Sequence, residues 1–309
     1  MKRPASPALA LAAAAAVLSA CGGESRLSLD RDAAVSLTGS AQPAETFADQ
    51  AARSAAIGAR TDGVAHSSIY GVHDGEEDSF ATECIGTQCR FFVPGTENAL
   101  PLAVPFLDGA QPVDPTEGVS AEAFLAKNGI TLIHVQSGLQ EPESRTRFYG
   151  AWMDHGAFML AETSVTETGD DGTPAGAFEQ RLAWAWGALT GSAPPSSATW
   201  RGVMVGTPQQ GSRRGHVLQG DATLVYNLES RTVDAGFTGI VDLDREAAHT
   251  VAAVRFDGID VASNGTFEFG TFGNLLRGGF GGPGHEEAAG AFEKQGIVGA
   301  FGAKRQTAN

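Results

Sequence analysis

Short runs that alternate between apolar and polar residues follow one another through the second half of the chain. In residues 237–243 the odd positions mostly face one way, which is the period of a strand with one buried face. Asn264-Gly265, between Val261 and Phe267, is a two-residue hairpin signal. Eight runs with no helix between them predict an up-and-down antiparallel barrel, with room for its own side chains or for one small ligand. The runs are residues 199–206, 216–227, 233–242, 250–256, 266–269, 275–280, 290–293 and 297–301.

The first half of the chain combines strand signals with two helical ones. The Ala-rich segment 44–59 has its larger residues at helical spacing. Ser120 is a candidate N-cap for a short helix through Lys127, which Gly129 would end. Residues 169–176 are acidic and Gly-rich, which favours a loop. Strands are expected at residues 67–70, 90–93, 131–136, 147–152 and 157–162.

The segment 193–197, with its Pro-Pro pair, is the clearest boundary in the chain. It predicts a mainly β protein in which a C-terminal eight-stranded antiparallel barrel follows a smaller β-rich domain. The expected parts are a signal peptide at 1–20, a tether at 21–59 with a short helix, the smaller domain at 60–195 and the barrel at 199–305.

The amino terminus has the pattern of a lipoprotein signal. Lys2 and Arg3 precede an apolar run at 8–18, which is too short to span a bilayer comfortably. The run ends in Leu18-Ser19-Ala20-Cys21, a match to the bacterial lipobox, although an ordinary signal peptide that contains a cysteine is the alternative. Acyl chains on Cys21 would anchor the protein to a membrane. No Asp follows Cys21, which favours the outer membrane, in a periplasmic or a surface-facing orientation.

The net charge of the chain narrows the classes of partner that it can bind. The formal net charge is −15, and removal of Lys2 and Arg3 with the signal peptide makes the chain more acidic still. Such a chain should repel nucleic acid and anionic lipid surfaces, so nucleic-acid binding is excluded.

Glycine makes up 40 of the 309 residues, much of it inside the strand-like runs. We expect these glycines to relieve crowding where the sheet bends.

Cys84 and Cys89 are the two cysteines outside the lipobox. Gly86 lies between them, so spacing and an exported location both favour a disulfide across a tight turn. A metal site would need two further ligands, which no paired Cys or His motif supplies. Such a short disulfide loop would stabilise a hairpin locally.

The end of the chain resembles a known family. Residues 278–293, which contain Phe280-Gly281-Gly282-Pro283, and residues 297–305 resemble the end of the β-barrel domain in transferrin-binding protein B and related surface lipoproteins, which typically read Phe-Tyr-Gly-Pro at this place. Residues 199–206 resemble the family's first barrel strand, and residues 149–155 a segment upstream of it in single-lobe relatives. The resemblance implies a barrel preceded by a smaller handle domain, on a scaffold that binds several ligands, haem and complement regulators among them.

Catalytic motifs are missing from the sequence. It contains no Gly-x-Ser-x-Gly, His-Glu-x-x-His or P-loop pattern, so we predict no enzyme, no cofactor and no metal site.

The acidic clusters at 74–78 and 170–171 lack EF-hand spacing and are expected to be solvated. His285 with Glu286 and Glu287 is expected to help the chain turn. Candidate haem ligands, for which core packing is the alternative, are Tyr70, His73, Tyr149, Met153 and His155, and the residues expected to pack are Trp184, Trp186 and Trp200.

These observations favour non-catalytic binding at the cell envelope. The candidate partners are a host or environmental protein, haem, or a small solute such as an iron carrier, with an outer-membrane transporter nearby. A structural or immune-shielding surface lipoprotein is the alternative. An exposed apolar patch or an open cavity would favour the binding protein.

Overall fold

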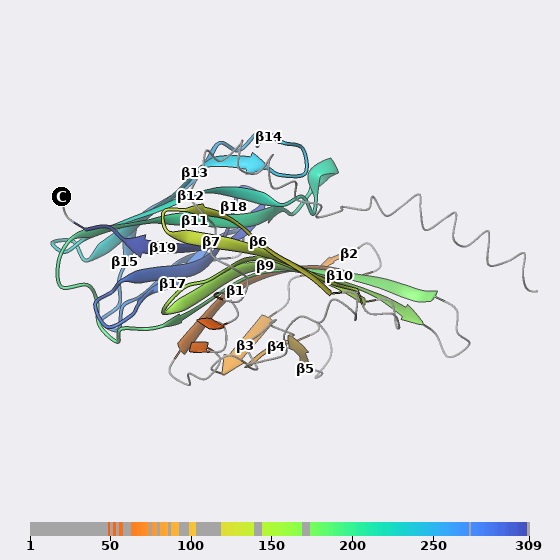
Figure 1. Cartoon of the computed structure of the whole chain (residues 1–309), viewed down its shortest axis with the longest axis horizontal. Coiled ribbons are helices and arrows are strands. Elements are labelled where there is room, and N and C mark those ends of the chain that lie inside the picture. Colours follow the sequence, from red (N-terminus) through yellow and green to blue (C-terminus); the bar gives the residue numbers. More distant parts are fainter. Residues whose placement is uncertain are drawn as a thin grey trace, which may run out of the picture.

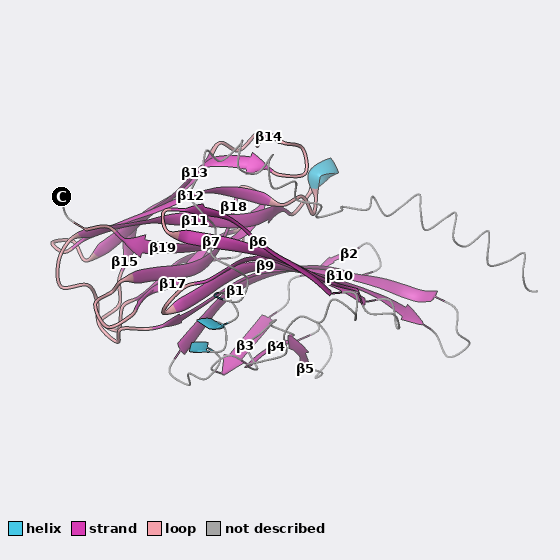
Figure 2. Cartoon of the chain, viewed as in Figure 1, coloured by secondary structure: helices cyan, strands magenta, loops and turns pink. Residues whose placement is uncertain are grey.

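The protein is mainly β, as predicted, and its strands form antiparallel sheets (Figures 1 and 2). The structure is a computed structural model. It describes residues 49, 52–53, 56–57, 63–73, 76–78, 81–85, 88–92, 99–102, 119–138, 144–168, 174–271 and 273–307. The lipobox with Cys21 lies outside these residues. No helix among them has the length and apolar character needed to cross a membrane.

The second half of the chain forms a ring of eight strands, one for each predicted run. Neighbouring strands pair antiparallel, and the last of them, β19, pairs with the first, β11. A bridge between Val261 and Phe267 joins β15 to β16 and completes the ring. The short β14 (Ala247–Ala248) adds to the edge of β13. The eight strands are β11 (Ala198–Pro208), β12 (Leu218–Asn227), β13 (Thr232–Asp242), β15 (Ala253–Asp260), β16 (Thr266–Thr271), β17 (Asn274–Gly281), β18 (Glu287–Lys294) and β19 (Ile297–Arg305).

Two details of the barrel differ from the sequence-based prediction. The turn at Asn264-Gly265 lies where it was expected, but its loop spans three residues, because the Ala262 amide donates to the Thr266 carbonyl. In β13 the alternation breaks at a bulge, where Gly239 adopts a φ of 61°. Phe237 and Ile240 therefore face the barrel interior, whereas Val241 packs outside.

The barrel interior is filled by its own side chains. Aromatic rings dominate it, and Phe237 stacks on Phe292 with ring centroids 4.2 Å apart. This resolves the choice left open by the sequence in favour of a packed barrel. The buried interior residues are Trp200, Met204, Leu218, Ala222, Leu224, Tyr226, Val233, Ala235, Phe237, Ile240, Val254, Phe256, Ile259, Val261, Phe267, Leu276, Phe280, Ala288, Phe292, Ile297, Phe301 and Ala303.

Glycines opposite phenylalanines make this packing possible. Gly290 pairs with Phe301 across β18 and β19, and Gly299 pairs with Phe292 in the same hairpin. A Cβ at Gly290 would lie 2.6 Å from the Phe301 ring, and one at Gly299 would lie 2.5 Å from the Phe292 ring. These glycines therefore make room for aromatic rings in a strand pair of continuous register, a role different from the relief at bends that we expected.

The first half of the chain forms a seven-stranded handle sheet and a separate three-stranded sheet. The handle sheet has the strand order β2-β1-β10-β9-β8-β7-β6, and the smaller sheet has the order β3-β4-β5. The handle strands are β1 (Gly63–His73), β2 (Glu76–Asp78), β6 (Val119–Lys127), β7 (Ile130–Gly138), β8 (Ser144–Trp152), β9 (Gly156–Thr168) and β10 (Pro174–Ala188). The others are β3 (Ala81–Ile85), β4 (Gln88–Phe92) and β5 (Ala99–Leu102).

The helix predicted from Ser120 to Lys127 is wrong. These residues belong to β6, which pairs with β7 through a tight turn at Asn128 and Gly129, both with positive φ. The turn chemistry and the partner strand outweigh the helical propensity of this segment. The loop predicted over 169–176 is also too long, because β10 begins at Pro174. In the Ala-rich segment 44–59, the five described residues are helical.

The handle sheet packs against the outer wall of the barrel. Ala183 and Ala185 of β10 face Ala289 and Ala291 of β18 within one buried cluster. Strands β18 and β19 are therefore buried on both faces, which is why the central outward positions, Ala289, Ala291, Val298 and Ala300, are small or β-branched. The cluster comprises Ile130, Leu132, Tyr149, Ala151, Met153, Phe158, Leu160, Ala183, Ala185, Val203, Val205, Val217, Val241, Leu243, Ala289, Ala291, Val298 and Ala300.

We expect Gly299→Ala to destabilise the barrel. Its Cβ would lie 2.5 Å from Phe292 and 2.8 Å from the Val205 carbonyl oxygen, so the strand or the ring must move. The free energy of unfolding should fall by about 1–3 kcal/mol, measured by urea denaturation. Gly236→Ala is the matched control, because nothing lies within 4 Å of the added atom. Equal denaturation midpoints for the two variants would contradict this role for Gly299.

Candidate functional site

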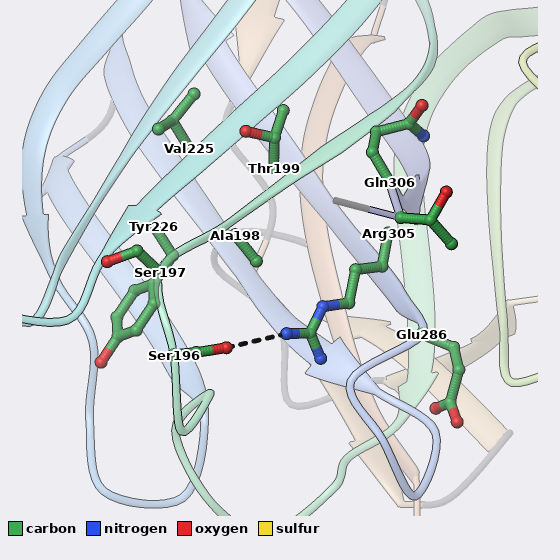
Figure 3. A pocket seen from close by; sticks show the side chains of 10 residues that line it. Ser196, Ser197, Ala198, Thr199, Val225, Tyr226, Glu286, Arg305 and Gln306 are labelled. Carbon is green, nitrogen blue, oxygen red and sulfur yellow. Dashed lines mark hydrogen bonds between the residues drawn. The ribbon is translucent and has the colours of Figure 1, made fainter. Parts of the chain in front are cut away.

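An open depression lies at one end of the barrel, where the link into β11 meets the end of β19 (Figure 3). Its volume is about 910 Å³, at the upper end of the range for ligand sites. Its lining contains hydroxyl groups, the carboxylate of Glu286, the guanidinium of Arg305 and apolar side chains. The lining residues are Ser196, Ser197, Ala198, Thr199, Val225, Tyr226, Glu286, Arg305, Gln306 and Thr307. We call this feature the rim depression.

The charged groups of the rim depression are held in place by the protein. The Arg305 guanidinium donates to Ser196 Oγ at 3.0 Å and to the Gly284 carbonyl at 2.9 Å, and it lies 5.8 Å from the Trp200 ring (Figure 3). Glu286 accepts from the Gly284 amide at 2.8 Å. Both side chains therefore present a fixed charge pattern.

An apolar patch lies beside the rim depression. Val225 and Leu228 are each 44% exposed, and they are the exposed large hydrophobic residues in the part of the chain that the structure describes. Val225 lines the depression itself, and the Leu228 amide donates to Ser197 Oγ at 3.0 Å. The rim thus offers an open depression and, beside it, two exposed apolar side chains.

The candidate haem ligands on β8 are core residues. Tyr149 and Met153 are each 1% exposed and lie in the cluster between the handle sheet and the barrel. The Tyr149 hydroxyl donates to Gln219 Oε1, and burial raises the pKa of Tyr149 well above its usual range. Neither side chain can reach a ligand from solvent. Tyr70 and His73 belong to β1, where only their backbone is described.

The tryptophans pack as predicted. Trp184, Trp186 and Trp200 are fully buried. Trp200 lies inside the barrel, whereas Trp184 and Trp186 alternate with Ala183 and Ala185 and so face away from it. On β8, Trp152 likewise lies on the face opposite Tyr149, as the strand period implies.

Glu287 forms a contact between the two sheets that the sequence reasoning missed. Its side chain is buried, and it accepts hydrogen bonds from the backbone amides of Asp154 and His155, both at 2.9 Å. These amides belong to the turn between β8 and β9 of the handle sheet. His285, by contrast, does serve the turn, with a φ of 58° and an amide that donates to the Gly282 carbonyl. The signal for Glu287 was an acid at the start of a strand, directly before the five apolar or small residues 288–292.

Burial controls the protonation of Glu287. Loss of solvent raises its pKa to about 7, although the two amide hydrogen bonds act in the opposite direction. Among its charged neighbours, Asp154 also raises the pKa and Lys304 lowers it. Asp154 in turn forms ion pairs with Lys304 and Arg53.

Cys84 and Cys89 lie directly opposite each other in the hairpin of β3 and β4. Directly opposite residues in an antiparallel pair have a Cα separation of about 4.5–5.5 Å, which suits a disulfide. The disulfide itself remains a prediction.

We expect Glu287→Gln to change how stability depends on pH. The folded pKa of about 7 lies above the ordinary value of 4.5, so between these values the folded protein keeps a proton that the unfolded chain has lost. The resulting stabilisation is complete below pH 4.5 and is lost as the pH rises through 7, with an upper size of roughly 3 kcal/mol.

The measurement is urea denaturation between pH 4.5 and 8. The difference in unfolding free energy between wild type and Glu287→Gln should shift with pH in favour of the variant as the pH rises. Glu286→Gln, at an exposed neighbouring position, is the control and should parallel wild type. A constant difference between wild type and Glu287→Gln across this range would refute the raised pKa.

No protein-family model and no curated protein sequence matches the chain. Among solved structures it is similar to transferrin-binding protein B of Haemophilus parasuis Hp5, with 14% identity over 79% of this chain and 45% of that one, at a TM-score of 0.34. Transferrin-binding protein B from serogroup B Neisseria meningitidis is matched at 14% identity over 78% and 44%, with a TM-score of 0.37. The N-lobe of lactoferrin-binding protein B of Moraxella bovis is matched at 12% identity over 78% and 99%, with a TM-score of 0.36. The chain thus spans slightly less than half the length of the two transferrin-binding protein B chains.

Proposed function

We propose that this protein is an outer-membrane lipoprotein that binds a protein partner at the barrel rim without catalysis. The observation that carries the proposal is the exposed pair Val225 and Leu228 beside the rim depression. We take these two side chains, together with the open depression beside them, as parts of one surface that another molecule covers. The lipobox at Cys21 and the sequence resemblance of the chain end support the location at the envelope.

A protein partner fits the rim better than haem does. The barrel interior is filled by side chains, and Tyr149 and Met153 are buried between the sheets. The rim supplies what protein interfaces use, which is an apolar centre with charged and hydroxyl groups around it. Arg305 and Glu286 would make polar contacts at its edge.

The lipid anchor would place the binding surface next to the membrane. Acyl chains on Cys21 would hold the barrel close to the membrane, at high effective concentration relative to an outer-membrane transporter. Capture of an iron carrier for such a transporter is the acquisition role that this arrangement suits. A shielding lipoprotein, the alternative, gains nothing from an exposed apolar patch beside an open depression.

We expect Val225→Asp with Leu228→Asp to abolish partner capture. The test is a pull-down by the chain without its signal peptide from serum and from environmental protein extract, with mass spectrometry and a Soret scan for haem. A charge in the apolar centre should lower recovery of the captured protein at least tenfold. Ala252→Asp introduces one aspartate at an exposed position outside the rim and should leave recovery unchanged, as a control for added negative charge elsewhere on the surface. Capture that persists in the double variant would place binding elsewhere, and failure to capture any protein would favour the shielding role.

We expect Cys21→Ser to release the protein from the membrane fraction. Serine cannot form the thioether through which the lipid is attached, so the acyl anchor is lost. Cell fractionation with labelled palmitate should show label on wild type and none on the variant. A variant that stays in the outer-membrane fraction would show that another segment provides the attachment.

A further inference from the structure

Three metal-ligating side chains meet at the end of β12 that lies away from the rim depression. His216 precedes β12, Asp242 ends β13, and Asp244 lies in the turn that follows. One donor atom from each residue lies within 4.8 Å of the other two. Neither the rim nor the contact at Glu287 uses these residues.

The spacing of the donors suits a metal ion. His216 Nδ1 lies 2.9 Å from Asp242 Oδ2 and 3.1 Å from Oδ1. Two ligands bound to Zn²⁺ at about 2.1 Å in tetrahedral geometry would lie about 3.4 Å apart, so a small outward shift of the two side chains would admit the ion. The imidazole nitrogen faces both carboxylate oxygens almost equally, so Asp242 presents both of its oxygens to the His216 side of the cluster.

Burial and charge favour a cation here. The Asp242 side chain is 1% exposed, and the His216 side chain is 21% exposed, so the cluster reaches solvent on the imidazole side. With a neutral imidazole, two carboxylates share this small volume, and a divalent ion would offset their repulsion. An imidazole nitrogen together with carboxylate oxygens suits Zn²⁺, whereas Ca²⁺ prefers oxygen ligands alone.

The hydrogen bonds of neighbouring groups show which side chains can act as ligands. Asp244 accepts from the Val217 amide at 2.7 Å, which holds its carboxylate beside His216. His249 lies close enough to feel the charges of Arg213, Asp242 and His216. Its Nδ1 accepts from the Val251 amide at 3.2 Å, so in the neutral ring Nε2 carries the proton and cannot serve as a ligand.

We propose that His216 Nδ1 and one oxygen each from Asp242 and Asp244 bind a first-row divalent transition ion such as Zn²⁺. The metal binds the lone pair of Nδ1, so a neutral His216 ring carries its single proton on Nε2 in the bound state, and a protonated ring releases one proton to solvent on binding. The ion would tie the start of β12 to the turn after β13 and stabilise that end of the barrel. Without it, His216 Nδ1 and the Asp242 carboxylate form a hydrogen bond.

The test is isothermal titration of the chain, purified without a histidine tag, with Zn²⁺ alone, Mn²⁺ alone and Ca²⁺ alone at pH 7.5. We expect one equivalent of Zn²⁺, bound more tightly than Ca²⁺. Thermal unfolding should show a higher Tm with Zn²⁺. No Zn²⁺ uptake, or preference for Ca²⁺, would overturn the proposal.

Variants separate the cluster from adventitious sites. Asp244→Asn keeps an acceptor for the Val217 amide, so we expect the fold to survive. Its Zn²⁺ affinity should fall at least about 100-fold, because the loss of a residue that only hydrogen-bonds to a metal ligand already lowers metal affinity 10–100-fold. His216→Gln should act in the same way. His249→Gln is the matched control and should bind like wild type. Undiminished binding in the Asp244 and His216 variants would overturn the assignment.

Discussion

The apolar contact between the handle sheet and the outer wall of the barrel is the constraint on which the rest of the structure depends. It buries β18 and β19 on both faces, so each position along them must fit a neighbour. Small residues satisfy this on the handle side, where Ala289 and Ala291 meet Ala183 and Ala185. On the inner side, glycines admit the rings of Phe292 and Phe301. The high glycine and alanine content of this segment follows from that double burial.

Polar groups within the contact fix the position of one sheet on the other. Glu287 holds two amides of the β8–β9 turn, and Tyr149 donates to Gln219 across the same contact. Apolar surfaces alone could slide by one residue, whereas a buried carboxylate tolerates only the arrangement in which its hydrogen bonds are made. Because its pKa lies near 7, Glu287 also makes this contact sensitive to pH.

Packing fills the interior and covers one wall of the barrel, and both candidate binding sites lie at its ends. The rim depression lies near Tyr226 at one end of β12, and the cluster of His216, Asp242 and Asp244 lies at the other. Loops and strand ends are where a rigid scaffold usually carries binding groups. The same barrel can therefore keep its core and change its partner, which is the general behaviour of widely used folds.

The sequence by itself determined the eight barrel strands, the turn at Asn264-Gly265 and the burial of the tryptophans, because strand period and turn chemistry are local properties. Only the tertiary structure decided that residues 120–127 pair as β6, since the partner β7 outweighs helical propensity. It also placed Tyr149 and Met153 in the core and the Glu287 carboxylate on the handle turn. The rim depression combines segments almost 110 residues apart, from Ser196 to Arg305. Such contacts depend on long-range packing, which no short window of sequence contains.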